Sequence, residues 1–155
     1  MAKILALTGG VGGAKLAVGL AQILAPHELL FAVNTGDDFE HLGLHIGPDI
    51  DSLTYALALQ NNTETGWGRA GESWNFIETL SSLGGEDWFR LGDKDLALHT
   101  VRSQLLRNGA SLTEATARIT QHMGISHTVA PMSNDPVRTI VRCDQGDLAF
   151  QHYFV

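Results

Sequence analysis

A glycine-rich run near the N-terminus has the residue types and spacing that phosphate binding needs. In TGGVGGAK, Gly9, Gly10, Gly12 and Gly13 lie between an apolar segment and Lys15. Glycines let a backbone turn through positive φ and come close to a ligand, and N–H groups at a helix start can bind an anion. We therefore predict a phosphate-binding element at residues 9–13, called here the glycine turn, to which Lys15 adds positive charge.

The glycine turn differs from both common phosphate-binding patterns. A Walker A loop needs four residues between its outer glycines and then Lys followed by Ser or Thr. Here three residues separate Gly9 from Gly13, and Leu16 stands where the Mg²⁺-binding hydroxyl would be. The dinucleotide pattern G-x-G-x-x-G starts correctly but has Lys15 at its third glycine. A tight turn that binds no ligand is the alternative interpretation.

Four aspartates form a second group that could act on phosphates. Asp37 and Asp38 lie in one polar loop, whereas Asp49 and Asp51 follow Pro48 at the start of a helical pattern. Carboxylates near a phosphate suggest a hard cation that bridges them to phosphate oxygens. We predict Asp37, Asp38 and Asp49 as Mg²⁺ ligands. The alternatives are a solvated turn for the loop and helix capping for the second pair.

The surrounding pattern predicts an α/β fold that brings these groups together. Apolar residues at 4–7 and 29–33 read as buried strands, and the residues at 14–24 have helical spacing. Strand, helix and strand in this order start a parallel, Rossmann-like sheet, in which ligands bind beyond the carboxyl ends of the strands. The glycine turn and the loop at 34–38 should share that edge. Asn34 and Thr35 open this loop and are predicted to contact the phosphates with the glycine turn.

The rest of the chain predicts a helical insertion and a hairpin that complete the sheet. Helices are expected at 48–59, 72–83, 96–107 and 111–122, a strand at 127–130, and a β-hairpin from 139–142 and 148–155. The last of these helices is predicted to open with a capping box formed by Ser111 and Glu114. The stretch between 40 and 47 is expected to be a loop, because Gly43 and Gly47 interrupt it. Trp67 and Trp88 lie beside glycines and could wall a flat aromatic ligand.

Composition excludes several classes of protein. The 155 residues have a formal net charge of −7 and no basic run, which argues against a nucleic-acid partner. A single cysteine suits a reducing compartment, and no apolar run approaches the length of a membrane span, so we expect a cytoplasmic protein. His41 and His45 raise the alternative of zinc, but no cysteine or HExxH pattern supports it. The final residues, DLAFQHYFV, read as a strand in progress, so we expect 1–155 to be the N-terminal part of a single longer domain.

Seven stretches together resemble one enzyme family. TGGVGGAKL, VNTGDDFEHLGLHIGPDIDS, GWG, LGDKDLALH, GASLTEAT, PMSNDPVRT and FQHYFV stand in the order and spacing of the 2-phospho-L-lactate transferases. These are the CofD/FbiA-type enzymes of coenzyme F-420 biosynthesis. The resemblance covers nearly the whole chain, and members are about twice as long.

The resemblance implies a transferase that needs Mg²⁺ and forms homodimers. Its donor is a GDP-activated phosphoacid, lactyl-2-diphospho-5′-guanosine or the enolpyruvyl analogue. The hydroxyl of the deazaflavin Fo attacks the β-phosphate, GMP leaves, and F-420-0 or its dehydro form results. Such a transfer depends mostly on positioning and charge neutralisation, which suits the glycine turn as the donor site and Asp49 and Asp51 as the catalytic residues.

The resemblance also implies an acceptor site and leaves one alternative function. Asp51, Lys94, Asp93 and Met132 fall at positions that it associates with Fo. This chain has Lys94 where most members have Arg, which loses the bidentate fork, and Asn134 where the usual motif has Asp. The alternative is a YvcK-type regulator, which opens with a similar glycine turn and binds UDP-sugars without transferring a group.

Overall fold

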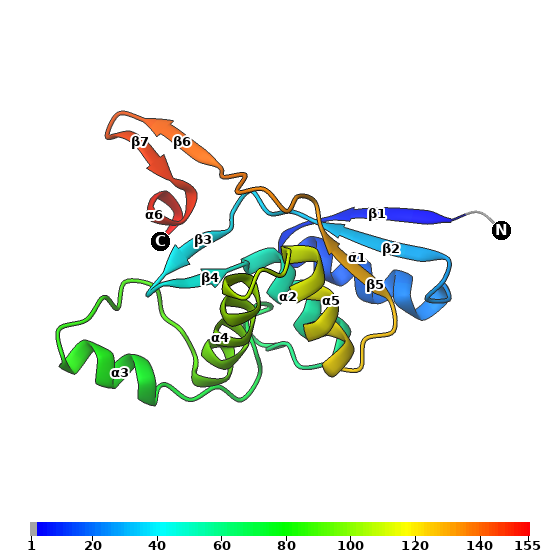
Figure 1. Cartoon of the computed structure of the whole chain (residues 1–155), viewed down its shortest axis with the longest axis horizontal. Helices are drawn as coiled ribbons and strands as arrows, with labels where there is room; N and C mark the ends of the chain where they lie inside the picture. The colour runs from blue at the N-terminus through cyan, green and yellow to red at the C-terminus, as the bar shows by residue number, and fades with distance from the viewer. Residues whose placement is uncertain (1–2) are drawn as a thin grey trace.

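A three-stranded parallel sheet organises the fold. The computed structural model describes residues 3–155, and in it β1 (Ile4–Thr8), β2 (Leu29–Val33) and β5 (Thr128–Pro131) pair in the order β1-β2-β5. Helix α1 (Gly10–Ile23) links the first two strands (Figure 1). In register, Ala6 lies beside Phe31, and Phe31 beside Val129. The predicted α/β, Rossmann-like architecture is confirmed.

Only one face of this sheet is packed within the described residues. The core joins alternate side chains of the three strands to α1, α2 and α5: Ala6, Ala17, Leu29, Phe31, Val33, Ile50, Leu53, Leu112 and Val129. Burying one such side chain contributes about 1.5–3 kcal/mol. On the opposite face Leu5 and Leu7 are 60% and 66% exposed. The sheet therefore presents exposed apolar side chains of β1 on that side.

The segment between β2 and β5 is mostly helical, as predicted. It contains β3 (Phe39–His41), β4 (Leu44–Ile46), α2 (Pro48–Leu57), α3 (Asn75–Ser82), α4 (Asp93–Arg107) and α5 (Leu112–His122). The predicted capping box is present, because Ser111 Oγ accepts from the Glu114 N–H while the Glu114 carboxylate accepts from the Ser111 N–H. Figure 1 shows α3 lying away from the sheet, at the far end of α4.

The stretch that was expected to be a loop is instead a β-hairpin. Strands β3 and β4 are antiparallel and meet through Leu42 and Gly43, whose φ angles are 54° and 69°. Two residues at positive φ make the tight turn that matches strand twist. Leucine rarely adopts this conformation, so the sequence lacked the usual Asn-Gly signal.

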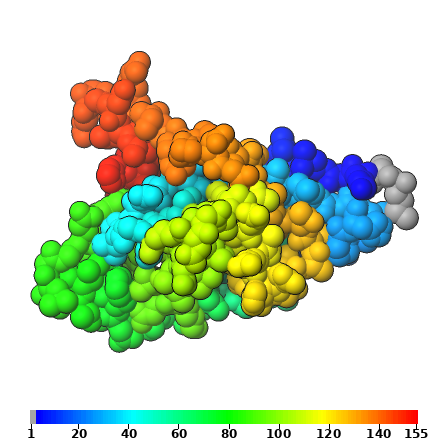
Figure 2. Space-filling view, in the orientation of Figure 1, coloured from blue at the N-terminus to red at the C-terminus, as the bar shows by residue number. Residues whose placement is uncertain are grey.

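The C-terminal hairpin is present but shorter than predicted. Strands β6 (Ile140–Cys143) and β7 (Gly146–Ala149) pair, and the chain then turns into α6 (Phe150–Phe154) rather than continuing as a strand. Two contacts fix the start of this helix. The Phe150 N–H donates to Thr139 O, and the side chain of Gln151 is buried. Figure 2 shows this unit projecting from the body of the molecule.

Residues 3–155 include no helix that is both long and apolar enough to cross a bilayer.

Candidate functional site

The glycine turn is the open N-terminus of α1. The helix begins at Gly10, four residues before the helical spacing that the sequence predicted at 14–24, and Gly9 is its N-cap without a side-chain hydrogen bond to the first turn. Gly10 has a φ of 62° and so uses the freedom that only glycine supplies cheaply. A Cβ on Gly13 would lie 3.1 Å from the Thr8 side chain, whereas a Cβ on Gly12 would meet nothing within 4 Å. The first-turn N–H groups therefore face an approachable space.

Asn34 holds two of the predicted carboxylates beside this turn. Its Nδ2 donates to Asp49 Oδ2 at 2.8 Å and to Asp37 Oδ2 at 3.1 Å, and its Oδ1 accepts from the Gly36 N–H at 3.0 Å. The carboxylates come from different elements, the loop after β2 and the first turn of α2. A Cβ on Gly9 would lie 3.1 Å from Asp49 Oδ2. The structure thus brings Asp37 and Asp49 together at the start of α1.

The C-terminal unit supports the same loop. Gln151 Nε2 lies 3.5 Å from Asp37 O, and the Thr139 N–H donates to Gly36 O. A Cβ on Gly36 would lie 2.8 Å from Thr139 Oγ1, so glycine is needed for this close contact. The loop that carries Asp37 is therefore fixed by residues more than 100 positions later in the chain. Thr35, beside it, is buried.

Lys15 faces a cavity next to the glycine turn. This cavity of about 380 Å³ lies between α1, α2 and the loop at 60–68, and Lys15, Ser52, Asn61, Thr63 and Trp67 contribute to its lining. Trp67 is 63% exposed, so its ring is open to a ligand. Trp88 has a different role, because it packs among Phe39, His41, Phe89 and His152.

Asp51 lies inside the protein, in an ion pair with Arg102. Arg102 of α4 is buried, and its two terminal nitrogens donate to the two oxygens of the Asp51 carboxylate. His99 lies between two carboxylates, with Nδ1 3.5 Å from Asp51 Oδ2 and Nε2 3.4 Å from Asp95 Oδ2. The Tyr55 hydroxyl donates to Asp95 Oδ1. We call Asp51, Tyr55, Asp95, His99 and Arg102 the buried polar network.

Asp38 is also turned away from the glycine turn. It is buried, its Oδ2 lies 3.4 Å from His45 Nε2, and neither carboxylate oxygen has a hydrogen-bond partner among the described residues. Burial raises the pKa of Asp38 to about 7, although the Arg102 charge opposes the shift. Burial has the opposite effect on a base and lowers the pKa of His45 to about 4, and the Arg102 charge lowers it further. Near neutral pH Asp38 is therefore partly protonated and His45 is neutral.

Asp93 caps a helix in another part of the chain. Its carboxylate accepts from the Phe76 N–H at 3.0 Å and from Ser73 Oγ at 2.7 Å, and it also bonds to Asn75 at the start of α3. These bonds, the Phe76 N–H first, lower the pKa of Asp93 to about 2. Capping of the start of α3 accounts for all of the side-chain hydrogen bonds of Asp93.

Lys94 and Met132 lie near the surface. Glu72 accepts from the Lys94 and Asp95 N–H groups and so closes the start of α4, while Lys94 Nζ lies 3.4 Å from Ala70 O. Met132 follows β5, donates its N–H to Val33 O and is 49% exposed.

Two sets of residues could be considered for a metal, and they differ in fit. Asp51, Asp95 and His99 offer ligand atoms within 4.8 Å of one another, but Arg102 already occupies both oxygens of Asp51 and adds a positive charge there. Asp37 and Asp49 each direct one oxygen at a shared amide donor and are only half-buried. These two carboxylates have no basic side chain within 4.0 Å among the described residues and so fit a hard cation better. His41 and His45, considered for zinc, belong to neither set.

Arg102 and His99 are the residues that sequence reasoning missed. His99 contacts two carboxylates, those of Asp51 and Asp95. A signal does exist, because Asp95, His99 and Arg102 recur at i, i+4 and i+7 and so place three ionisable groups on one face of α4. A charged stripe is usually solvated, and only the position of Asp51 on the facing helix shows that this one is buried.

The parallel sheet and its flanking helices define an α/β protein of the Rossmann-like type. The chain belongs to the family 2-phospho-L-lactate transferase CofD, whose profile it matches over residues 4–155.

Individual relatives agree with this membership. The 2-phospho-L-lactate transferase of Methanospirillum hungatei is 40% identical over 149 residues, which are 96% of this chain and 50% of the relative. The corresponding enzyme of Methanosarcina acetivorans is 41% identical, over 96% of this chain and 48% of the relative. The phosphoenolpyruvate transferase of Kitasatospora aureofaciens is 41% identical, over 99% of this chain and 50% of the relative. The chain thus spans about half the length of these relatives.

Proposed function

We propose that the protein to which this chain belongs transfers a phospholactyl or phosphoenolpyruvyl group from a GDP-activated donor to the hydroxyl of the deazaflavin Fo. The hydroxyl oxygen bonds to the β-phosphorus of the donor, the bond from that phosphorus to the bridging oxygen breaks, and GMP leaves. The product is F-420-0 or its dehydro form. Relatives named for both acids support the class of reaction, and the choice between the acids is left to experiment.

One observation carries this proposal: Asp37 and Asp49 meet through Asn34 at the open start of α1. The first-turn N–H groups of α1 would bind the donor phosphates, since a helix N-terminus favours negative charge. The carboxylates would repel the same phosphates unless a cation lay between them, and we propose Mg²⁺, held by Asp37 and Asp49. When bound, it would neutralise charge on the phosphoryl oxygens.

The remaining residues have proposed roles that follow from their positions. Asn34 orients the two carboxylates, and Lys15 and Trp67 supply a charge and a ring beside the donor. We assign to Asp49 the role of accepting the proton of the attacking hydroxyl, because its carboxylate lies beside Gly9 at the start of α1. Asp51 is too enclosed by Arg102 to act as a free base without rearrangement, so we propose that it holds α2 and α4 in place beneath the site.

The proposed acceptor site involves Lys94, Met132 and Asp93. Lys94 and Met132 are exposed enough to contact Fo, whereas Asp93 would act through the position of α3 and α4. The apolar sheet face at Leu5 and Leu7 suits the proposal that residues 1–155 are the N-terminal part of one larger domain. Dimerisation and a cytoplasmic location complete the proposal.

A reconstituted assay tests the reaction. The complete protein would be incubated with Fo, GTP, Mg²⁺, a guanylyltransferase and either phospholactate or phosphoenolpyruvate, and the product identified by mass spectrometry. Formation of an F-420-0 species with one acid, lost in Asp49→Asn and retained in Asp144→Asn, supports the proposal. Asp144 is an exposed residue of the β6–β7 turn and serves as the matched control. No product, together with tighter binding of UDP-N-acetylglucosamine than of GDP by calorimetry, would favour the regulatory alternative.

A further inference from the structure

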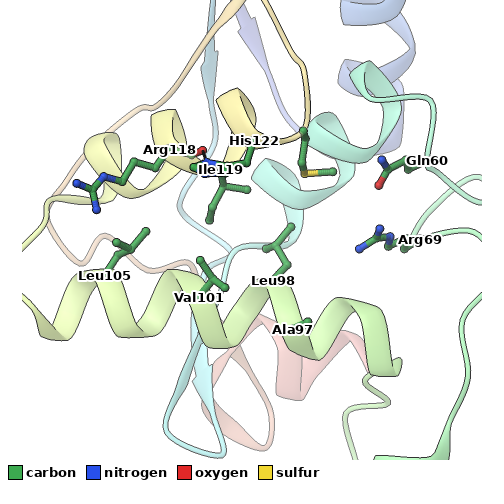
Figure 3. Close-up of a pocket in the computed structure, with 10 residues that line it drawn as sticks. Gln60, Arg69, Ala97, Leu98, Val101, Leu105, Arg118, Ile119 and His122 are labelled. Atoms are coloured by element: carbon green, nitrogen blue, oxygen red, sulfur yellow. Dashed lines mark hydrogen bonds between the residues drawn. The ribbon is translucent and has the colours of Figure 1, made fainter.

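A second cavity lies between α4 and α5, away from the glycine turn. Its volume is about 630 Å³, within the usual range for small-molecule sites. Figure 3 shows Leu98, Val101 and Leu105 rising from α4 toward Ile119 of α5. None of the residues that line it belongs to the transfer site proposed above.

The walls of this cavity are apolar and accessible. Leu98 and Ile119 are buried at its base and pack with Met123, while Val101 is 48% exposed. An apolar ligand that covered these side chains would remove them from water, which favours binding. The cavity therefore suits a ligand with an apolar body.

The ionisable side chains that line the cavity are all basic. Arg69, Arg118 and His122 line it, and no carboxylate of residues 3–155 does, in a protein whose net charge is −7. Neither arginine has a carboxylate within 4.0 Å among the described residues. The His122 Nδ1 bonds to Arg118 O at 2.8 Å, which assigns the proton to Nδ1. Because basic side chains line this cavity in an otherwise acidic protein, the cavity favours a negatively charged ligand.

One polar group in the lining has no partner. The Gln60 Oε1 atom is buried without a hydrogen bond in the described part of the chain, although the Gln60 backbone is fixed by bonds to Tyr55 and Ala70. An unpaired buried amide oxygen is unfavourable. A ligand that donates to it, or that accepts from the amide after rotation, would satisfy the group. Figure 3 shows Gln60 and Arg69 together at one end of the cavity and Arg118 at the other.

We propose that this cavity binds a small amphipathic anion, with an aromatic or branched apolar body and a single carboxylate, sulfonate or phosphate group. The body packs on Leu98, Val101 and Ile119, and the anionic group pairs with Arg118 or Arg69. Helix α4 lines the cavity and also carries Arg102, which donates to Asp51 of α2. A ligand in the cavity would therefore also stabilise the position of α4.

A fluorescence titration tests the proposal on the complete protein. The probe is 8-anilinonaphthalene-1-sulfonate, and N-phenyl-1-naphthylamine is its uncharged counterpart. Arg118→Gln should weaken binding of the sulfonate roughly three- to tenfold, the range for a charged hydrogen bond, and leave the neutral probe unchanged. Val101→Trp should fill the cavity and weaken both probes on the order of tenfold or more. Arg142→Gln changes an exposed arginine of the C-terminal hairpin and should alter neither.

Thermal melts accompany the titration, because this dye also binds loosened proteins. Val101 and Arg118 are exposed, so both variants should melt within a few degrees of the parent. Binding that is absent in the complete protein, or equal for the two probes, or unchanged by Val101→Trp, would overturn the proposal. A variant with a normal melt and the expected loss of affinity would support it.

Discussion

Removal of Arg102 should be among the most damaging single substitutions in this protein. Arg102→Met keeps much of the side-chain length but removes the charge that faces both oxygens of Asp51. The bond from Arg102 Nη1 to His45 O, at 3.3 Å, is lost as well. Because Asp51 is 5% exposed, water cannot replace the guanidinium without opening the interface between α2 and α4.

The expected cost follows from this burial. Removing one partner of a buried ion pair typically costs about 3–5 kcal/mol, because the other charge is left uncompensated. Asp38 adds to the cost, since the Arg102 charge also lowers the pKa of that carboxyl against the effect of burial. Removing both partners should cost less, so Asp51→Leu combined with Arg102→Met is expected to recover about 2 kcal/mol or more relative to Arg102→Met alone.

Urea unfolding of the complete protein measures these values through the midpoint and the slope. Arg107→Met is the matched control, because Arg107 is an exposed arginine on the same helix that donates to Gly43 O. It should change the free energy of unfolding by less than about 1 kcal/mol. The reasoning is refuted if Arg102→Met costs no more than the control, or if the double variant is as unstable as the sum of the two single ones.

Three further predictions concern the proposed site and the α3–α4 junction. Lys15→Ala should weaken GDP binding by about 1–3 kcal/mol in calorimetry, and unchanged affinity would remove Lys15 from the donor site. Asp37→Asn should raise the Mg²⁺ concentration for half-maximal turnover, and turnover that persists in excess EDTA would contradict the metal assignment. Asp93→Ala should lower the melting temperature at pH 6, because the folded-state pKa of about 2 lies below the unfolded value, so the stabilisation is present above pH 4 and lost as pH falls toward 2. The gap between parent and variant should therefore narrow between pH 4 and pH 2.5, and a gap of constant size would refute the capping argument.

The sequence predicted the elements whose signals are local. The apolar strand at 29–33, the capping box of Ser111 and the glycine turn all depend on neighbouring residues, and each lies where expected. The β3–β4 hairpin was not predicted, because Leu42 adopts a positive φ that leucine rarely adopts. The predicted end of the last strand was wrong, because α6 follows β7 and is fixed by a contact from Gln151 to Asp37 O, a residue far away in the sequence.

The candidate site was predictable in composition but not in orientation. Spacing correctly places Asp49 and Asp51 in the first turn of α2. Neighbouring positions on a helix differ by about 100° in direction, so two residues apart point to nearly opposite sides. Which side faces Asn34 and which faces Arg102 depends on the packing of α4, which starts more than 40 residues later.

The four aspartates show how one residue type acquires different states from its surroundings. Asp37 and Asp49 stay half-exposed at the start of α1, whereas Asp51 is neutralised by Arg102 and burial raises the pKa of Asp38 to about 7. Of these four carboxylates, only those of Asp37 and Asp49 therefore lie beside the glycine turn. Two carboxylates balance the charge of one divalent cation. The burial of Asp38 and Asp51 thus sets the charge of the proposed site as directly as the residues that face the ligand.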